Sequence, residues 1–108
     1  MTMAKYLVRA TLTSAGVNGL LKEGGSRRRE AVKALAEGAG GSLEAFYFAF
    51  GDDDVYAILE LPDSVSAAAA SLAVNASGIV SSKIVVLLTP EEVDEATKKT
   101  VAYRAPGA

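Results

Sequence analysis

Arginines and tyrosines are the side chains of this sequence that could do chemistry, because its 108 residues include no histidine and no cysteine. That composition excludes Ser-His and Cys-His nucleophiles, thiolate clusters, histidine haem ligation and the usual zinc sites. Three consecutive arginines, Arg27 to Arg29, follow the glycine pair Gly24-Gly25. Because a guanidinium binds carboxylates through a planar fork of N–H donors, this segment is the first candidate for a binding site.

Arg28 lies in the middle of an apolar stripe on a predicted helix. At about 100° per residue, the members of the stripe fall within about 60° of one line along the helix: Val17, Leu20, Leu21, Ala31, Val32, Leu35 and Ala39. Arg28 falls about 20° from Val17 and Leu35, so it should face the sheet. A charge in such a position must be paired or must bind a ligand, because an unpaired buried charge is very costly.

Two interpretations of Arg28 follow. In the first, Arg28 binds an anionic group such as a carboxylate in a pocket between helix and sheet, and Gly24, one turn earlier on the same face, leaves space beside it. In the second, Arg28 forms an internal salt bridge with Glu44, Glu60 or Asp54, or its charged end simply extends to solvent.

Tyrosines could supply a second part of a site. Tyr6, Tyr47 and Tyr56 lie on three different predicted strands, so their hydroxyls could converge on one region of the sheet. In a site without histidine, tyrosine, arginine and carboxylate groups remain for proton transfer. The alternative is that these tyrosines fill the core and form local hydrogen bonds. The candidate ligand-binding residues are therefore Arg28, Gly24, Tyr47, Tyr56 and Arg9.

Composition and spacing argue against other kinds of site. The run Asp52-Asp53-Asp54 lacks the spaced ligands of a calcium loop and is interpreted as a turn, so neither a metal nor a cofactor is expected. A net charge of −2, and an aromatic strand without flanking basic residues, argue against nucleic-acid binding. No apolar run approaches the ~20 residues of a membrane span, and no signal-peptide core follows Met1, so we expect a cytoplasmic protein without membrane contact.

Apolar periodicity and helix-capping signals predict one domain over residues 1–108. Strands are expected at 4–12, 43–50, 55–61 and 83–88, helices at 15–39, 64–77 and 90–99, and a loose tail at 100–108. The first helix should bend or break at Gly24-Gly25, and the last helix begins with the capping box of Thr89 and Glu92. The last strand is apolar on both faces, which predicts a central position. This order predicts an α+β, ferredoxin-like βαββαβ antiparallel sheet with an extra C-terminal helix.

The sheet face opposite the two helices also needs a cover. The aromatic strand has two sets of side chains on opposite faces, and neither set is polar: Phe46, Phe48 and Phe50 on one face, Ala45, Tyr47 and Ala49 on the other. Such an apolar face is larger than a monomer usually exposes. We therefore expect a homodimer through the sheet face, with a higher oligomer as an extension and the terminal helix from Pro90 against the partner.

Two segments carry a resemblance to a known family: LLKEGGSRRREAVKALAEGAGGSLEAFYFAFGDDDVYAILELPD and VVLLTPEEVDEA. They resemble the GYD-domain family, and the similarity extends from Lys5 to about Lys99. The family is named for a Gly-x-Tyr-Asp turn, in which Gly51 and Asp54 match and Asp53 takes the tyrosine position. The resemblance implies a bacterial protein with a dimeric α+β-barrel fold, whose superfamily includes cofactor-free monooxygenases, haem-degrading enzymes, lactone isomerases and ligand-sensing domains.

Two functions agree with these features. The first is a non-enzymatic small-molecule-binding or stress-associated module that holds a small anionic or aromatic molecule between the helices and the sheet. The second, by analogy with the superfamily, is a cofactor-free monooxygenase or isomerase in which Arg28 orients the substrate and Tyr47 or Tyr56 moves protons. The missing turn tyrosine and the absence of histidine favour the first function.

Overall fold

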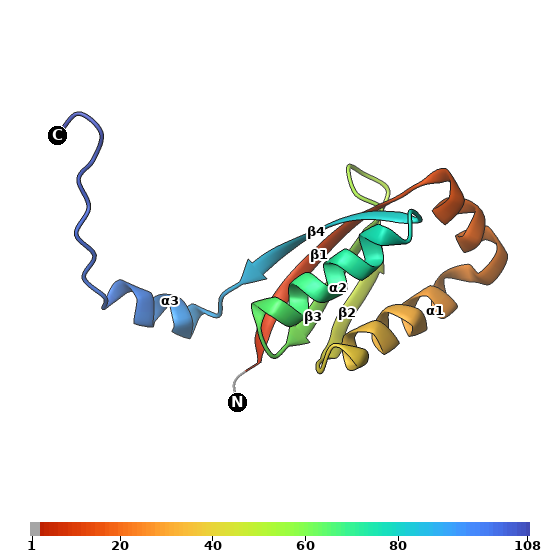
Figure 1. The fold of residues 1–108 in the computed structure, drawn as a ribbon, viewed down its shortest axis with the longest axis horizontal. Coiled ribbons are helices and arrows are strands. Elements are labelled where there is room, and N and C mark those ends of the chain that lie inside the picture. Colours follow the sequence, from red (N-terminus) through yellow and green to blue (C-terminus); the bar gives the residue numbers. More distant parts are fainter. Residues whose placement is uncertain (1–2) are drawn as a thin grey trace.

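The computed structural model describes residues 3–108, which form a four-stranded antiparallel sheet with two helices packed on one face (Figure 1). In chain order the elements are β1 (Ala4–Leu12), α1 (Ser14–Gly38), β2 (Ser42–Phe48), β3 (Val55–Leu61), α2 (Ser64–Ala76), β4 (Val80–Leu87) and α3 (Pro90–Thr97). The strand order is β2-β3-β1-β4. The predicted ferredoxin-like α+β fold with an extra C-terminal helix is confirmed.

Strand β4 corrects one detail of the prediction, because it lies at the edge of the sheet while β1 and β3 occupy the centre. It also begins at Val80, three residues earlier than predicted. Its two apolar sides have different surroundings. Ile84 packs against the core below the helices, whereas Val85 pairs with Leu7 and lies on the uncovered side. Apolar residues on both sides of β4 therefore reflect one side covered by the helices and one uncovered side, and they do not indicate a central position.

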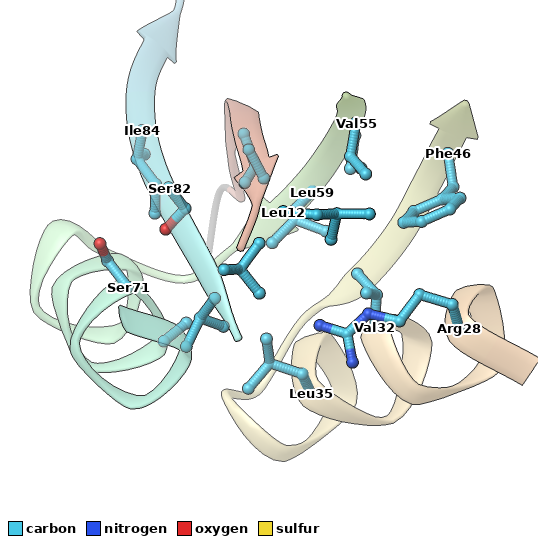
Figure 2. Close-up of a pocket in the computed structure, with 16 residues that line it drawn as sticks. Leu12, Arg28, Val32, Leu35, Phe46, Val55, Leu59, Ser71, Ser82 and Ile84 are labelled. Atoms are coloured by element: carbon cyan, nitrogen blue, oxygen red, sulfur yellow. The ribbon is translucent and has the colours of Figure 1, made fainter. Parts of the chain in front are cut away.

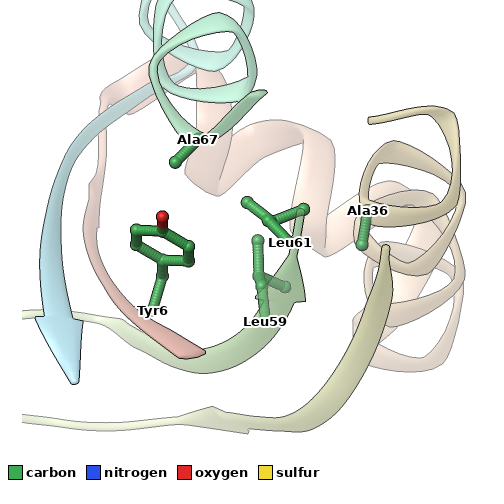
Figure 3. Packing of buried hydrophobic residues seen from close by; sticks show 5 residues of the cluster. All are labelled: Tyr6, Ala36, Leu59, Leu61 and Ala67. Atoms are coloured by element: carbon green, nitrogen blue, oxygen red, sulfur yellow. The ribbon is translucent and has the colours of Figure 1, made fainter. Parts of the chain in front are cut away.

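Pleating of the strands divides the side chains between two faces. In β1, Tyr6, Val8 and Ala10 face the helices, and Lys5 and Arg9 face the other side, which we call the open face. The helix side holds a core cluster of Tyr6, Ala36, Leu59, Leu61 and Ala67 (Figure 3). Alanines from α1 and α2 meet the larger side chains of β1 and β3 there, so both helices approach the sheet closely at this end.

Helix α1 consists of two helical parts separated by a break at Gly24, whose φ of 81° and ψ of 171° are not helical. A positive φ is readily adopted by glycine and costs other residues energy, so the predicted break has its physical cause here. The next residue, Gly25, lies against the ring of Phe48; a Cβ at this position would lie 2.9 Å from a ring carbon. The glycine pair therefore bends the chain and brings the second part of α1 close to β2.

Capping side chains begin all three helices. Thr13 accepts a hydrogen bond from the Gly16 N–H, and Asp63 accepts one from the Ser66 N–H. Thr89 and Glu92 form the capping box that the sequence predicts. Hydrogen bonds from Ser66 lower the pKa of Asp63, because they favour its ionised form.

The C-terminal segment extends away from the sheet in Figure 1. Helix α3 ends at Thr97, two residues before the predicted end, and residues 98–108 form neither helix nor strand. Val93, Val101 and Tyr103 are exposed along this segment. No helix within residues 3–108 has the length and apolar character needed to cross a membrane.

Candidate functional site

A cleft lies between α1, α2 and the helix side of the sheet (Figure 2). The space between its walls that is free of protein atoms is about 570 Å³, and part of that space is open solvent. Its floor is formed by Val8 and Ala10 of β1 and by Val55 and Ala57 of β3. Both central strands thus contribute small or branched apolar side chains, and these leave room between the two helices.

Arg28 extends from α1 into this cleft (Figure 2). It is the only charged residue among those lining the cleft, and it also borders two adjoining hollows. Within residues 3–108, Arg28 forms no ion pair. Glu23, which borders one of the adjoining hollows, is not paired with it either. The cleft therefore combines apolar walls with one cation that has no counter-charge.

The carboxylates expected to pair with Arg28 have other partners. Glu44 and Glu60 both form ion pairs with Lys5 on the open face. Asp54 accepts a hydrogen bond of 2.8 Å from the Leu12 N–H. The internal salt bridge considered from the sequence is therefore wrong for residues 3–108.

Gly24 acts through the backbone instead of lining the cleft. It is exposed, and a Cβ added to it would meet nothing within 4 Å, so it is not needed to leave space beside a ligand. Its positive φ ends the first part of α1 and lets the second part, which carries Arg28, begin with a new direction. Gly24 thus positions Arg28 without contacting the cleft.

Polar atoms on the opposite wall of the cleft are engaged with one another. The side-chain carbonyl oxygen of Asn75 accepts hydrogen bonds from the Ser82 N–H at 2.7 Å and from the Ser82 hydroxyl at 3.1 Å. The Asn75 amide also donates to the Ser71 hydroxyl at 3.4 Å. This group joins α2 to β4. Sequence reasoning missed it, although a polar pair spaced by four residues on an alanine-rich helix was a usable signal.

Tyr47, Tyr56 and Arg9 lie on the open face, opposite to Arg28. The strand register pairs Tyr47 with Tyr56, Tyr56 with Arg9, and Arg9 with Lys83, which gives one row across all four strands. Tyr47 is 70% exposed, whereas Tyr6 is only 3% exposed and lies in the core. The three tyrosines therefore do not converge, and Arg28 cannot share one site with Tyr47 or Tyr56 within a single chain.

Two cations on the open face, Lys5 and Arg9, have carboxylate neighbours. Lys5 contacts Glu44 and lies 3.1 Å from a Glu60 oxygen, and these hydrogen bonds, that to Glu44 foremost, raise the pKa of Lys5. Arg9 Nε lies 3.8 Å from Asp53 Oδ2; this nitrogen is buried and finds no hydrogen-bond acceptor within residues 3–108.

The aspartate run serves the turn between β2 and β3. The Asp54 N–H donates to the Ala10 carbonyl at 2.8 Å, and the Asp54 carbonyl accepts from the Ala49 N–H at the same distance. Within residues 3–108, no group of three or more acidic, histidine or cysteine side chains could hold a metal ion. The aspartates therefore hold the turn against β1.

Comparison with known protein families shows to which family the chain belongs. The GYD domain family model matches residues 6–97. The chain belongs to the GYD-domain family. Searches of the curated proteins and of the solved structures found no match. The match covers the sheet from Tyr6 of β1 onward and helices α1, α2 and α3, so the cleft and the open face except Lys5 lie inside it, and residues 98–108 follow it.

Proposed function

We propose that this GYD-domain protein is a homodimeric binding module that holds a small anionic or aromatic molecule in the cleft between its helices and its sheet. One observation carries the proposal: Arg28 borders an apolar cleft and forms no ion pair within residues 3–108. A partly buried cation without a counter-charge is costly, and a bound anion removes that cost. The apolar walls provide area for burying the rest of the molecule.

The chemistry of the cleft supports binding over catalysis. Arg28 is the only titratable side chain that lines it, and arginine stays protonated at all ordinary pH values. General acid–base catalysis needs a group that changes its protonation state near the reacting atoms. Tyr47 and Tyr56, which the enzymatic hypothesis assigned to proton transfer, belong to the opposite face of the sheet.

The open face supports the homodimer. A row of apolar side chains crosses all four strands there, from Ala45 through Ile58 and Leu7 to Val85. The polar row beside it contains the Arg9 Nε atom, which is buried and lacks an acceptor within residues 3–108. A second copy packed on this face would cover the apolar row and could supply that acceptor.

Binding of 2-naphthoate tests the cleft. We expect Arg28→Gln to raise the dissociation constant measured by calorimetry at least about tenfold, because a charge-assisted hydrogen-bonded pair is lost. Arg27→Gln is the matched control. It removes the same charge at the preceding position, from an exposed residue that does not line the cleft. Equal affinities for the two variants would disprove the site.

A further inference from the structure

Building on the proposed function, we infer that the ligand is a monocarboxylate with an extended apolar body. The walls of the cleft show why the body is apolar. All but three of the residues that line the cleft are apolar; the exceptions are Arg28, Ser71 and Ser82. The two serines are uncharged and hydrogen-bond to Asn75, so neither balances a second charged end of the ligand. The ligand therefore has one charged end, at Arg28.

The charge of the ligand follows from the same inventory. Arg28 supplies a single positive charge, and no other charged residue lines the cleft. One carboxylate balances it and matches the planar fork of the guanidinium. A phosphate monoester carries about −1.5 to −2 charges at neutral pH, so part of its charge would remain unbalanced between apolar walls. A dicarboxylate would leave one whole charge without a partner, so a monocarboxylate is favoured over both.

The position of Arg28 indicates how such a molecule lies. Arg28 borders the cleft and also the outer hollow between α1 and α2, which Ala31, Ala73 and Ile79 help to line. It thus lies where the two spaces meet, near the entrance between the helices (Figure 2). We place the carboxylate at this entrance and the apolar body over Ala10 and Ala57, whose small side chains form the floor.

A set of eight-carbon probes tests the inference: octanoate, 1-octanol, suberate and octyl phosphate, with hexanoate as the shorter acid, each below its micelle concentration. Calorimetry on the full chain should give the tightest binding for octanoate. Each methylene should contribute about fourfold, so hexanoate should bind roughly 15-fold more weakly. Suberate and octyl phosphate should both bind at least about tenfold more weakly than octanoate.

The variant Arg28→Gln separates this inference from the proposed function. We expect it to lower the affinity for octanoate to that for 1-octanol while the dependence on chain length remains. Tighter binding of octyl phosphate or suberate, or equal binding of hexanoate and octanoate, would overturn the monocarboxylate assignment and leave the anion site intact. Unchanged octanoate binding by Arg28→Gln would instead overturn the proposed site itself.

Discussion

The two faces of the sheet differ in whether their cations have carboxylate neighbours. On the open face, Lys5 lies between Glu44 and Glu60, and Arg9 lies beside Asp53. On the helix side, Arg28 is the only charged residue lining the cleft, and it forms no ion pair within residues 3–108. The ion pairs of Lys5 join β1 to β2 and β3, so this charge is balanced inside the chain. A cation that extends into an apolar cleft without a carboxylate partner is instead a sign of a ligand.

The difference has a geometric origin. Lys5 and Glu60 are direct partners in the pairing of β1 with β3, so their side chains lie next to each other on one face. Arg28 instead comes from a helix and reaches over strand residues that face the helices. Within residues 3–108, the strand residues that face the helices include no carboxylate, so none of them is in place to neutralise Arg28.

The largest effect is expected on the proposed dimer, in which a second copy covers the open face. Ile58 lies in the middle of the apolar row, and Ile58→Asp would bury one unpaired charge per copy in the proposed dimer. We expect the dimer dissociation constant, measured by sedimentation equilibrium, to rise at least about a hundredfold. Leu72→Asp is the control, because Leu72 is 71% exposed on α2. A dimer equally stable in both variants would show that the open face is not the interface.

A smaller effect is expected from filling the cleft. Val74 borders both the cleft and the outer hollow, so Val74→Trp should occupy space that the ligand needs. We expect octanoate to bind about tenfold or more weakly, at a stability cost of about 1–3 kcal/mol from crowding. Leu72→Trp places the same ring on the outer side of α2 and should leave binding unchanged. Retained affinity in Val74→Trp would place the ligand elsewhere.

The smallest effect is expected from Lys5, the cation paired with Glu44 and Glu60, and it is a change in how stability depends on pH. Because folding raises the pKa of Lys5 above 10.5, its ion pairs stabilise fully at neutral pH and are lost as the pH rises through the folded-state value. Lys5→Met should therefore lower the melting temperature slightly at pH 7 and flatten its decline above about pH 10.5. Octanoate binding should not change. A loss of binding would mean that the two faces are coupled.

Signals from residues close together in the sequence were enough to predict the helices and strands and the direction of Arg28. The break at Gly24 and the capping box at Thr89 depend on residues close together in the chain, and both are present. The inward direction of Arg28 followed from its helical spacing to Val32 and Leu35. The same stripe was wrong before the break at Gly24, where Val17 is 43% and Leu21 79% exposed.

Long-range pairing could not be predicted in the same way. Tyr6 and Tyr56 both have even numbers, yet they face opposite sides, because the register pairs Tyr56 with Arg9. Which face a side chain takes in one strand is independent of the numbering in another strand, and a shift of one residue would reverse it. The edge position of β4 likewise depends on strand order, which no local pattern contains.

The strand order also has a consequence for the synthesis of the chain. The central strand β1 leaves the ribosome first, but its two neighbours begin only at Val55 and Val80. Meanwhile β2 and β3 can pair across their short turn. Until Val80 and the residues after it emerge, one edge of β1 has no strand to pair with and can pair with another nascent chain. The last strand made therefore determines when the central strand β1 is protected from pairing with another chain.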